Sequence, residues 1–225
     1  IASLRILAMI FVPVSVLLIT LHTPIVQLMF QRGKFTDWSV DMTAGPLMYY
    51  SFGMTFFALE IILMRVYFSF KDTLTPALIG IFCVLVHVGV ILSLRCILQH
   101  QSIALAAVVS KGLKVVILLV LLNLKRLDLQ PGKNLLFVAK LLVSAIISGF
   151  VVSAMHGTLG SILPLADAAR GLARTAYLVI HLGAACGAGI LAFLLASLVL
   201  GIEESRLVMS RLRLRKQHGT PGQGC

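Results

Sequence analysis

The fold of this chain is decided by the stretch FQRGKFT at residues 30–36, the apolar run at 49–70 and the stretch KDTLTP at 71–76. The first stretch is a short polar turn that ends one apolar segment. The run that follows is long enough to cross a bilayer as a helix, which takes about 20 residues. The charged turn then begins a third apolar segment. The rest of the chain repeats this plan of apolar segments joined by short polar turns.

The composition places most of the chain in lipid. Hydrophobic residues make up 59% of it, charged residues only 12%, and its mean hydropathy is +1.03. Soluble domains have about 45–50% apolar and about 25% charged residues, so a soluble fold is excluded. In lipid every backbone polar group needs an internal partner, which leaves helices or a closed barrel. The apolar runs are about 20 residues long without strict alternation, which favours helices over barrel strands.

The sequence therefore predicts an all-α integral membrane protein with six transmembrane helices. We expect the helices at about 4–21, 46–70, 76–98, 103–124, 135–155 and 172–202. The expected units are four helices, a carboxy-terminal helix pair and a basic tail, at 1–128, 129–202 and 203–225.

Two polar loops and one packing motif stand out between and within these helices. The first loop, at 31–41, carries Trp38, and the second lies at 156–171. Gly183 and Gly187 have the GxxxG spacing that permits close helix packing.

The distribution of positive charge predicts the orientation. The net charge is +11, and six crossings put both ends of the chain on one side. That side carries twelve Lys and Arg residues and the opposite side five. Because positive residues concentrate in cytoplasmic loops, we expect both ends in the cytoplasm. The basic tail is then interpreted as an orientation signal attracted by lipid phosphates, in preference to a dedicated nucleic-acid or protein site.

The sequence contains no pattern typical of an enzyme. It has no nucleophile–base motif, metal cluster or phosphate-binding glycine loop, so we expect no catalysis, cofactor or metal. The cysteines, at 83, 96, 186 and 225, form no CxxC pair. We interpret them as small apolar packing residues, in preference to a disulfide or a metal site.

Four pieces of sequence within residues 30–76 resemble one known family. They are Phe30-Gln31-Arg32-Gly33-Lys34-Phe35-Thr36, Tyr50-Ser51-Phe52-Gly53, Arg65-Val66-Tyr67-Phe68-Ser69 and Asp72-x-x-Thr75-Pro76. Their order and spacing resemble the ninth to eleventh transmembrane helices of the MurJ/MviN-type lipid II flippases, within the multidrug/oligosaccharidyl-lipid/polysaccharide exporter superfamily. The remainder is similar in hydropathy and helix count, as helices nine to fourteen of a fourteen-helix protein. Ile1 opens directly into an apolar helix without signal-peptide features, which we interpret as the carboxy-terminal part of a longer chain.

The resemblance implies a transporter of undecaprenyl-linked peptidoglycan precursor (lipid II) across the bacterial inner membrane. Two six-helix lobes are expected to alternate around a central cavity, and two further helices form a groove for the lipid tail. This chain would supply most of the second lobe and that helix pair. The implied partners are lipid II, membrane lipids and a missing amino-terminal lobe. Two alternatives stay open: an exporter of another polysaccharide-lipid or a drug in the same superfamily, and a membrane scaffold without transport.

Ionisable residues inside the predicted helices are the candidate site residues, because a charge at membrane depth is costly. Glu60 would face the cavity and pair with a cation or take up a proton, with Arg65 as its candidate partner. A structural pair with another helix is an equally supported interpretation. Lys111 and Lys114 are three residues apart and share a helix face. They would attract phosphates of the lipid carrier, or else line water or snorkel to an interface.

His87 is alone on an apolar helix, where a packing histidine is favoured over a proton relay. Some members of the family are thought to bind sodium with an Asn and an Asp one turn apart in this region. The segment here reads Val86-His87-Val88-Gly89-Val90-Ile91-Leu92. It lacks the Asn–Asp pair, so the resemblance carries no sodium ligand onto this chain.

The turn residues of the motif are interpreted as structural or gating. The charge count places Arg32 outside, away from a cytoplasmic substrate, and Gly33 provides a turn with positive φ. Asp72 and Thr73 are expected to cap the helix that begins near Pro76.

Overall fold

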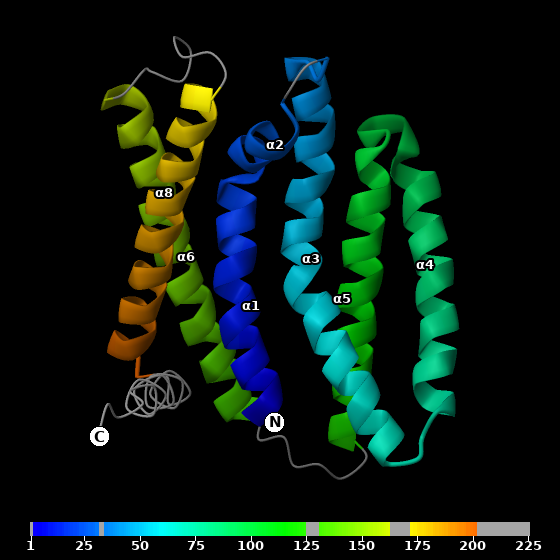
Figure 1. Ribbon diagram of the computed structural model, residues 1–225. Coiled ribbons are helices and arrows are strands. Elements are labelled where there is room, and N and C mark those ends of the chain that lie inside the picture. The colour runs from blue at the N-terminus through cyan, green and yellow to red at the C-terminus, as the bar shows by residue number, and fades with distance from the viewer. Residues whose placement is uncertain (1, 32–33, 125–130, 163–171, 202–225) are drawn as a thin grey trace, which may run out of the picture.

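The computed structural model describes residues 2–31, 34–124, 131–162 and 172–201, which form a bundle of long helices (Figure 1). The helices are α1 (Ala2–Thr20), α2 (His22–Phe30), α3 (Asp37–Ser69), α4 (Leu74–Leu98), α5 (Gln101–Leu124), α6 (Pro131–Ile162) and α8 (Leu172–Val199). Six of those described, all except the nine-residue α2, are long and apolar enough to cross a membrane. The predicted all-α class and the six spans are therefore confirmed.

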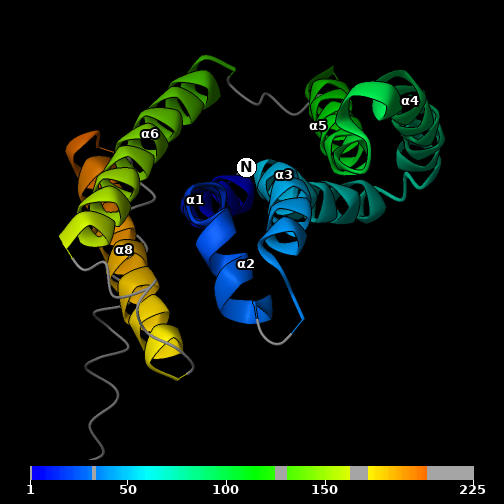
Figure 2. The ribbon, with the colours of Figure 1, turned by 90° about the horizontal axis from the view of Figure 1, so that it is seen from above.

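The membrane-spanning helices stand in a row, in the order α8, α6, α1, α3, α5 and α4 (Figure 2). The middle of the row is α1 and α3, with the α6–α8 pair on one flank and the α4–α5 pair on the other. The start of α1 and the end of α8 lie at the same end of the bundle (Figure 1). This agrees with six crossings that return the chain to the side on which it began.

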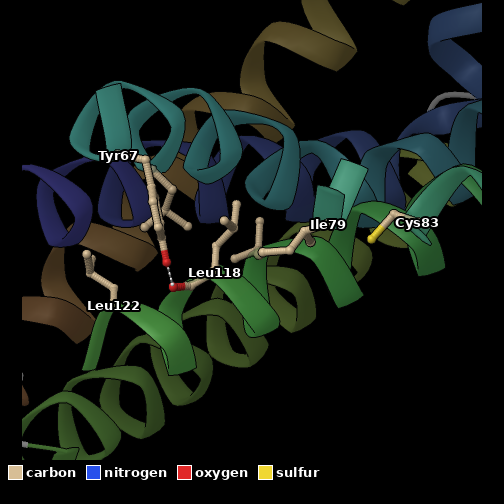
Figure 3. Packing of buried hydrophobic residues seen from close by; sticks show 7 residues of the cluster. Tyr67, Ile79, Cys83, Leu118 and Leu122 are labelled. Atoms are coloured by element: carbon tan, nitrogen blue, oxygen red, sulfur yellow. Dashed lines mark hydrogen bonds between the residues drawn. The ribbon is translucent and has the colours of Figure 1, made fainter. Parts of the chain in front are cut away.

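One apolar cluster ties α3, α4 and α5 together (Figure 3). Its buried members are Leu63, Tyr67, Ile79, Cys83, Val115, Leu118 and Leu122. The Tyr67 hydroxyl donates a hydrogen bond of 2.8 Å to the Leu118 carbonyl oxygen, so its polar end is satisfied inside the cluster. The cluster fixes the relative position of the three helices that carry Glu60, Lys111 and His87.

The other flank packs through Gly189, one of the small residues of α8. A Cβ atom at Gly189 of α8 would collide with Val152 of α6 and would lie 2.8 Å from Leu17 Cδ2 of α1. The Ser148 hydroxyl donates to the Gly189 carbonyl oxygen at 2.8 Å. In contrast, a Cβ at Gly183 or Gly187 meets nothing within 4 Å in the described part of the chain. Within the described residues the close approach of helices is therefore at Gly189 and not at the GxxxG pair.

Helix α3 begins nine residues before the predicted start at 46, so Trp38 lies in its first turn and not in a loop. The prediction assumed that Pro46 starts a helix, but here Pro46 lies inside one. Proline lacks the N–H that would bond to the carbonyl four residues earlier. That carbonyl belongs to Met42, and the His100 ring donates to it at 3.1 Å instead. The replacement donor lets the helix continue through the proline.

Two further helix ends differ from the prediction. Helix α6 continues to Ile162, so His156 lies on a helix where a loop was expected. There it stacks on His181 of α8, with ring centroids 4.9 Å apart. Helix α8 ends at Val199 and not at 202, because Gly201 adopts φ +65° just past the end. A left-handed glycine at this position is a common helix stop.

Candidate functional site: a charged cluster beside a cavity

The described part of the chain brings one acid and two bases together in the helix interior. Glu60 projects from α3, and Lys111 and Lys114 project from α5. The Lys111 ammonium lies 2.8 Å from Glu60 Oε2 and donates to Oε1 at 3.0 Å. The Lys114 ammonium donates to the same Oε1 at 2.7 Å. Both carboxylate oxygens are therefore occupied, and Glu60 links α3 to α5 through two ion pairs.

The cluster lies at half the depth of the bundle. Lys111 and Lys114 are the eleventh and fourteenth of the 24 residues of α5. With a rise of about 1.5 Å per residue, each lies about 15 Å or more from both ends of the helix. Placing one charged side chain at a bilayer centre costs about 2.5–3.5 kcal/mol on insertion scales. Pairing with Glu60 offsets part of this cost for the two lysines.

A cavity of about 500 Å³ opens between α4 and α5 beside the cluster. Its polar wall consists of His87, Ser110, Lys111 and Lys114. The remaining lining is small or apolar and comprises Ala77, Gly80, Ile81, Cys83, Val84 and Ala107. The volume lies in the range of about 300–1,000 Å³ that is usual for small-molecule sites.

The two lysines differ in how they meet this cavity. The Lys111 side chain is 40% exposed, whereas those of Lys114 and Glu60 are 11% and 12% exposed. The Lys114 ammonium packs closely against α4, since a Cβ atom at Gly80 would lie 3.7 Å from it. Lys114 is thus enclosed between helices, and Lys111 has room to move.

The structure brings together four of the five candidate cavity residues. His87 joins the lysines in the cavity wall, with its Nδ1 atom 3.5 Å from the Ser110 hydroxyl oxygen. Arg65 is exposed on α3 and does not pair with Glu60. The suggested Arg65 pairing is wrong because five residues turn a helix by roughly 140°, which points the two side chains apart.

The turn motif is only partly described. Arg32 and Gly33 lie outside the described residues. Asp72 accepts hydrogen bonds from the Thr75 backbone N–H at 3.1 Å and from the Thr75 hydroxyl at 2.8 Å. The predicted capping by Asp72 at the start of α4 is therefore confirmed, whereas Thr73 makes no side-chain capping bond. Pro76 is buried in the first turn of α4.

Two polar contacts between helices were not predicted from the sequence. Arg5 of α1 donates to Asn134 Oδ1 of α6 from Nε at 3.1 Å and from a terminal nitrogen at 2.6 Å. The His156–His181 stack joins α6 to α8. The only sequence signal for either was a polar residue within an apolar run, which does not identify a partner. Within the described residues no group of three or more His, Cys, Asp or Glu side chains is placed to hold a metal.

A protein family and a solved structure are similar to this chain. A family model described as lipid II flippase MurJ matches residues 1–166. A solved structure titled lipid II flippase MurJ, inward closed conformation, superposes with a TM-score of 0.65 over 88% of this chain and 37% of that chain. Its sequence identity is 22%, so it supports the fold alone.

Curated relatives carry the description probable lipid II flippase MurJ. That of Bdellovibrio bacteriovorus is 28% identical over 211 residues, 91% of this chain and 36% of the relative. The Vibrio cholerae protein is 26% identical over 201 residues, 89% of this chain and 37% of the relative. That of Buchnera aphidicola subsp. Schizaphis graminum is 30% identical over 138 residues, 61% of this chain and 27% of the relative. The chain thus spans about a third of the length of these relatives, and it belongs to the MurJ family of lipid II flippases.

Proposed function

We propose that this chain forms the carboxy-terminal six-helix part of a transporter that moves lipid II across the bacterial inner membrane. Its family membership supports this lipid-linked peptidoglycan precursor as the substrate. The observation that carries the proposal is the Glu60–Lys111–Lys114 cluster at half the bundle depth, beside a cavity. Ionisable groups inside a membrane mark substrate and ion pathways, and a polar headgroup needs such a pathway to cross.

The proposed mechanism is alternating access and involves no bond chemistry. Helices α1 to α5 would form most of the second lobe, which rocks against an amino-terminal lobe around a polar cavity. The α6–α8 pair would hold the lipid tail, since both helices present large apolar side chains on their exposed faces. Both ends of the chain would be cytoplasmic, as the positive-charge count predicts.

Complementation tests this function directly. The complete gene that contains this chain is expressed in bacteria depleted of their own lipid II flippase. We expect the unmodified protein to restore growth and cell shape. Glu60→Ala is expected to abolish rescue, because it leaves the ammonium groups of Lys111 and Lys114 without their carboxylate at half the bundle depth. Lys140→Gln serves as the control, because it removes a positive charge from α6. This helix lies on the opposite flank of the bundle from α4 and α5 (Figure 2).

The outcomes separate the proposed function from its two alternatives. Membrane levels of each variant are measured by immunoblot, so that loss of rescue is not confused with loss of protein. An unmodified protein that reaches the membrane without restoring growth would favour an exporter of another polysaccharide-lipid or a drug. Full rescue by Glu60→Ala and by the double variant Lys111→Ala/Lys114→Ala would favour a scaffold without transport.

A further inference from the structure

The charges of the Glu60–Lys111–Lys114 cluster do not cancel. It contains two ammonium groups and one carboxylate, and both carboxylate oxygens are already occupied. No other acid of the described residues forms an ion pair with either lysine. Among the described residues one positive charge therefore remains uncompensated at half the bundle depth. A charge in a low-dielectric interior is expensive without a counter-charge, so the cluster attracts an anion.

The arrangement directs that charge toward the cavity. Both lysines line it, whereas Glu60 lies behind them and is not part of its wall. Lys111 is the accessible member, with 40% of its side chain exposed against 11% for Lys114. Lys114 alone is sufficient to neutralise Glu60, through its contact of 2.7 Å. Lys111 is thus able to leave the carboxylate without leaving it unpaired.

The walls of the cavity indicate the class of anion. The Ser110 hydroxyl and the His87 ring continue the polar side that the lysines begin. A lysine presents three N–H donors, which suits an anion with several acceptor oxygens. A phosphate group provides such oxygens, whereas a halide is a single small acceptor. A volume of about 500 Å³ also exceeds what a halide requires.

We propose that the α4–α5 cavity is a phosphate-binding site in which Lys111 exchanges between Glu60 and the bound phosphate, while Lys114 stays paired with the Glu60 carboxylate and balances its charge. The proposal rests on the proposed function, because the transported lipid supplies the phosphate groups. A free phosphate or diphosphate from the aqueous phase shares the same chemistry. Glu60 acts here as a resident anion that keeps Lys111 in place until a phosphate enters.

The test reads the local potential inside the cavity. Ala107→Cys places a thiol in the cavity wall of the complete protein, in a background without other cysteines, purified in nanodiscs of phosphatidylcholine. Its reaction rates are measured with an anionic reagent, sulfonatoethyl methanethiosulfonate, and with a cationic one, the trimethylammonioethyl analogue. We expect the anionic reagent to react faster. Lys111→Gln is expected to lower the ratio of the two rates at least fivefold.

Two further variants control for charge and folding. Glu60→Gln/Lys114→Gln removes one charge of each sign and keeps Lys111, so the ratio is expected to stay within twofold of its original value. Lys140→Gln removes a positive charge far from the cavity and is also expected to leave the ratio unchanged. A ratio that Lys111→Gln does not lower, or that Lys140→Gln lowers equally, would overturn the proposal. So would a thiol that neither reagent reaches.

Protection of the same thiol identifies the source of the phosphate. Inorganic diphosphate is added at constant ionic strength, and in a second arm the nanodiscs contain phosphatidic acid. Slower labelling with either probe supports the site, and slowing by the lipid alone assigns it to a headgroup. Equal slowing by chloride, or none with any probe, contradicts a phosphate site. The labelling rates do not depend on growth, so the two proposals fail separately. Rescue of growth without protection of the thiol would contradict only the phosphate site. Protection without rescue would contradict only the proposed function.

Discussion

At the scale of single residues, burial cost identified the important side chains but not their partners. Glu60, Lys111 and Lys114 were each recognisable from the sequence as charges within apolar segments. Their pairing was not, because Glu60 is 51 and 54 residues away from the two lysines. Local spacing suggested Arg65 instead, which the helical geometry rules out. Sequence thus locates a costly group, and only packing shows what compensates it.

The glycines of α8 give a residue-scale prediction. Gly189→Ala would drive a methyl group into Val152, whose β-branched side chain has little freedom to move. Overpacking of this kind costs about 1–3 kcal/mol. Gly187→Ala on the open face would instead gain about 1 kcal/mol of helix propensity. We expect thermal unfolding of the complete protein in detergent to show Gly189→Ala less stable and Gly187→Ala equally or more stable than the original.

The essential result is that the two Gly→Ala changes in α8 shift the stability of the protein in opposite directions. Equal stability of the two variants would mean that α8 does not approach α6 and α1 as closely at Gly189 as described.

At the scale of elements, apolar length predicted every spanning helix, and local chemistry predicted the ends less well. The start of α4 was predictable because Asp72 caps through a contact three residues along the chain. The start of α3 was not, because the donor that compensates Pro46 comes from His100, far along the sequence. The end of α6 was also missed: His156, expected in a loop, lies on the helix and stacks on His181 of α8.

His100 gives the prediction at this scale. His100→Ala removes the donor to the Met42 carbonyl and leaves the helix before Pro46 with one hydrogen bond fewer. A hydrogen bond contributes about 1 kcal/mol, so amide exchange in residues 37–45 should accelerate about fivefold. Hydrogen–deuterium exchange read by mass spectrometry provides the measurement, with peptides from α6 as an internal reference.

His100→Gln is the matched variant, because an amide N–H is able to replace the ring donor. Exchange that is equally fast in both variants, or unchanged in His100→Ala, would show that this contact does not hold the helix together across the proline.

At the scale of the whole molecule, an even number of crossings and an uneven charge distribution act together. The start of α1 and the end of α8 lie at one end of the bundle (Figure 1). Twelve Lys and Arg residues were assigned to that side and five to the other. Geometry alone does not say which end faces the cytoplasm. From the positive-inside rule we expect the turn before α3 outside and the turn before α4 inside.

The orientation is testable with two exposed lysines at opposite ends of α3, Lys34 and Lys71. Lys34→Cys and Lys71→Cys are made separately in a cysteine-free background of the complete protein, and intact spheroplasts are treated with a membrane-impermeant maleimide. We expect rapid labelling of the Lys34→Cys thiol and protection of the Lys71→Cys thiol until the membrane is permeabilised. The reverse pattern would mean that the bundle has the opposite orientation in the membrane. The orientation of the α4–α5 cavity would then be reversed as well, because the cavity and both turns belong to the same bundle of helices.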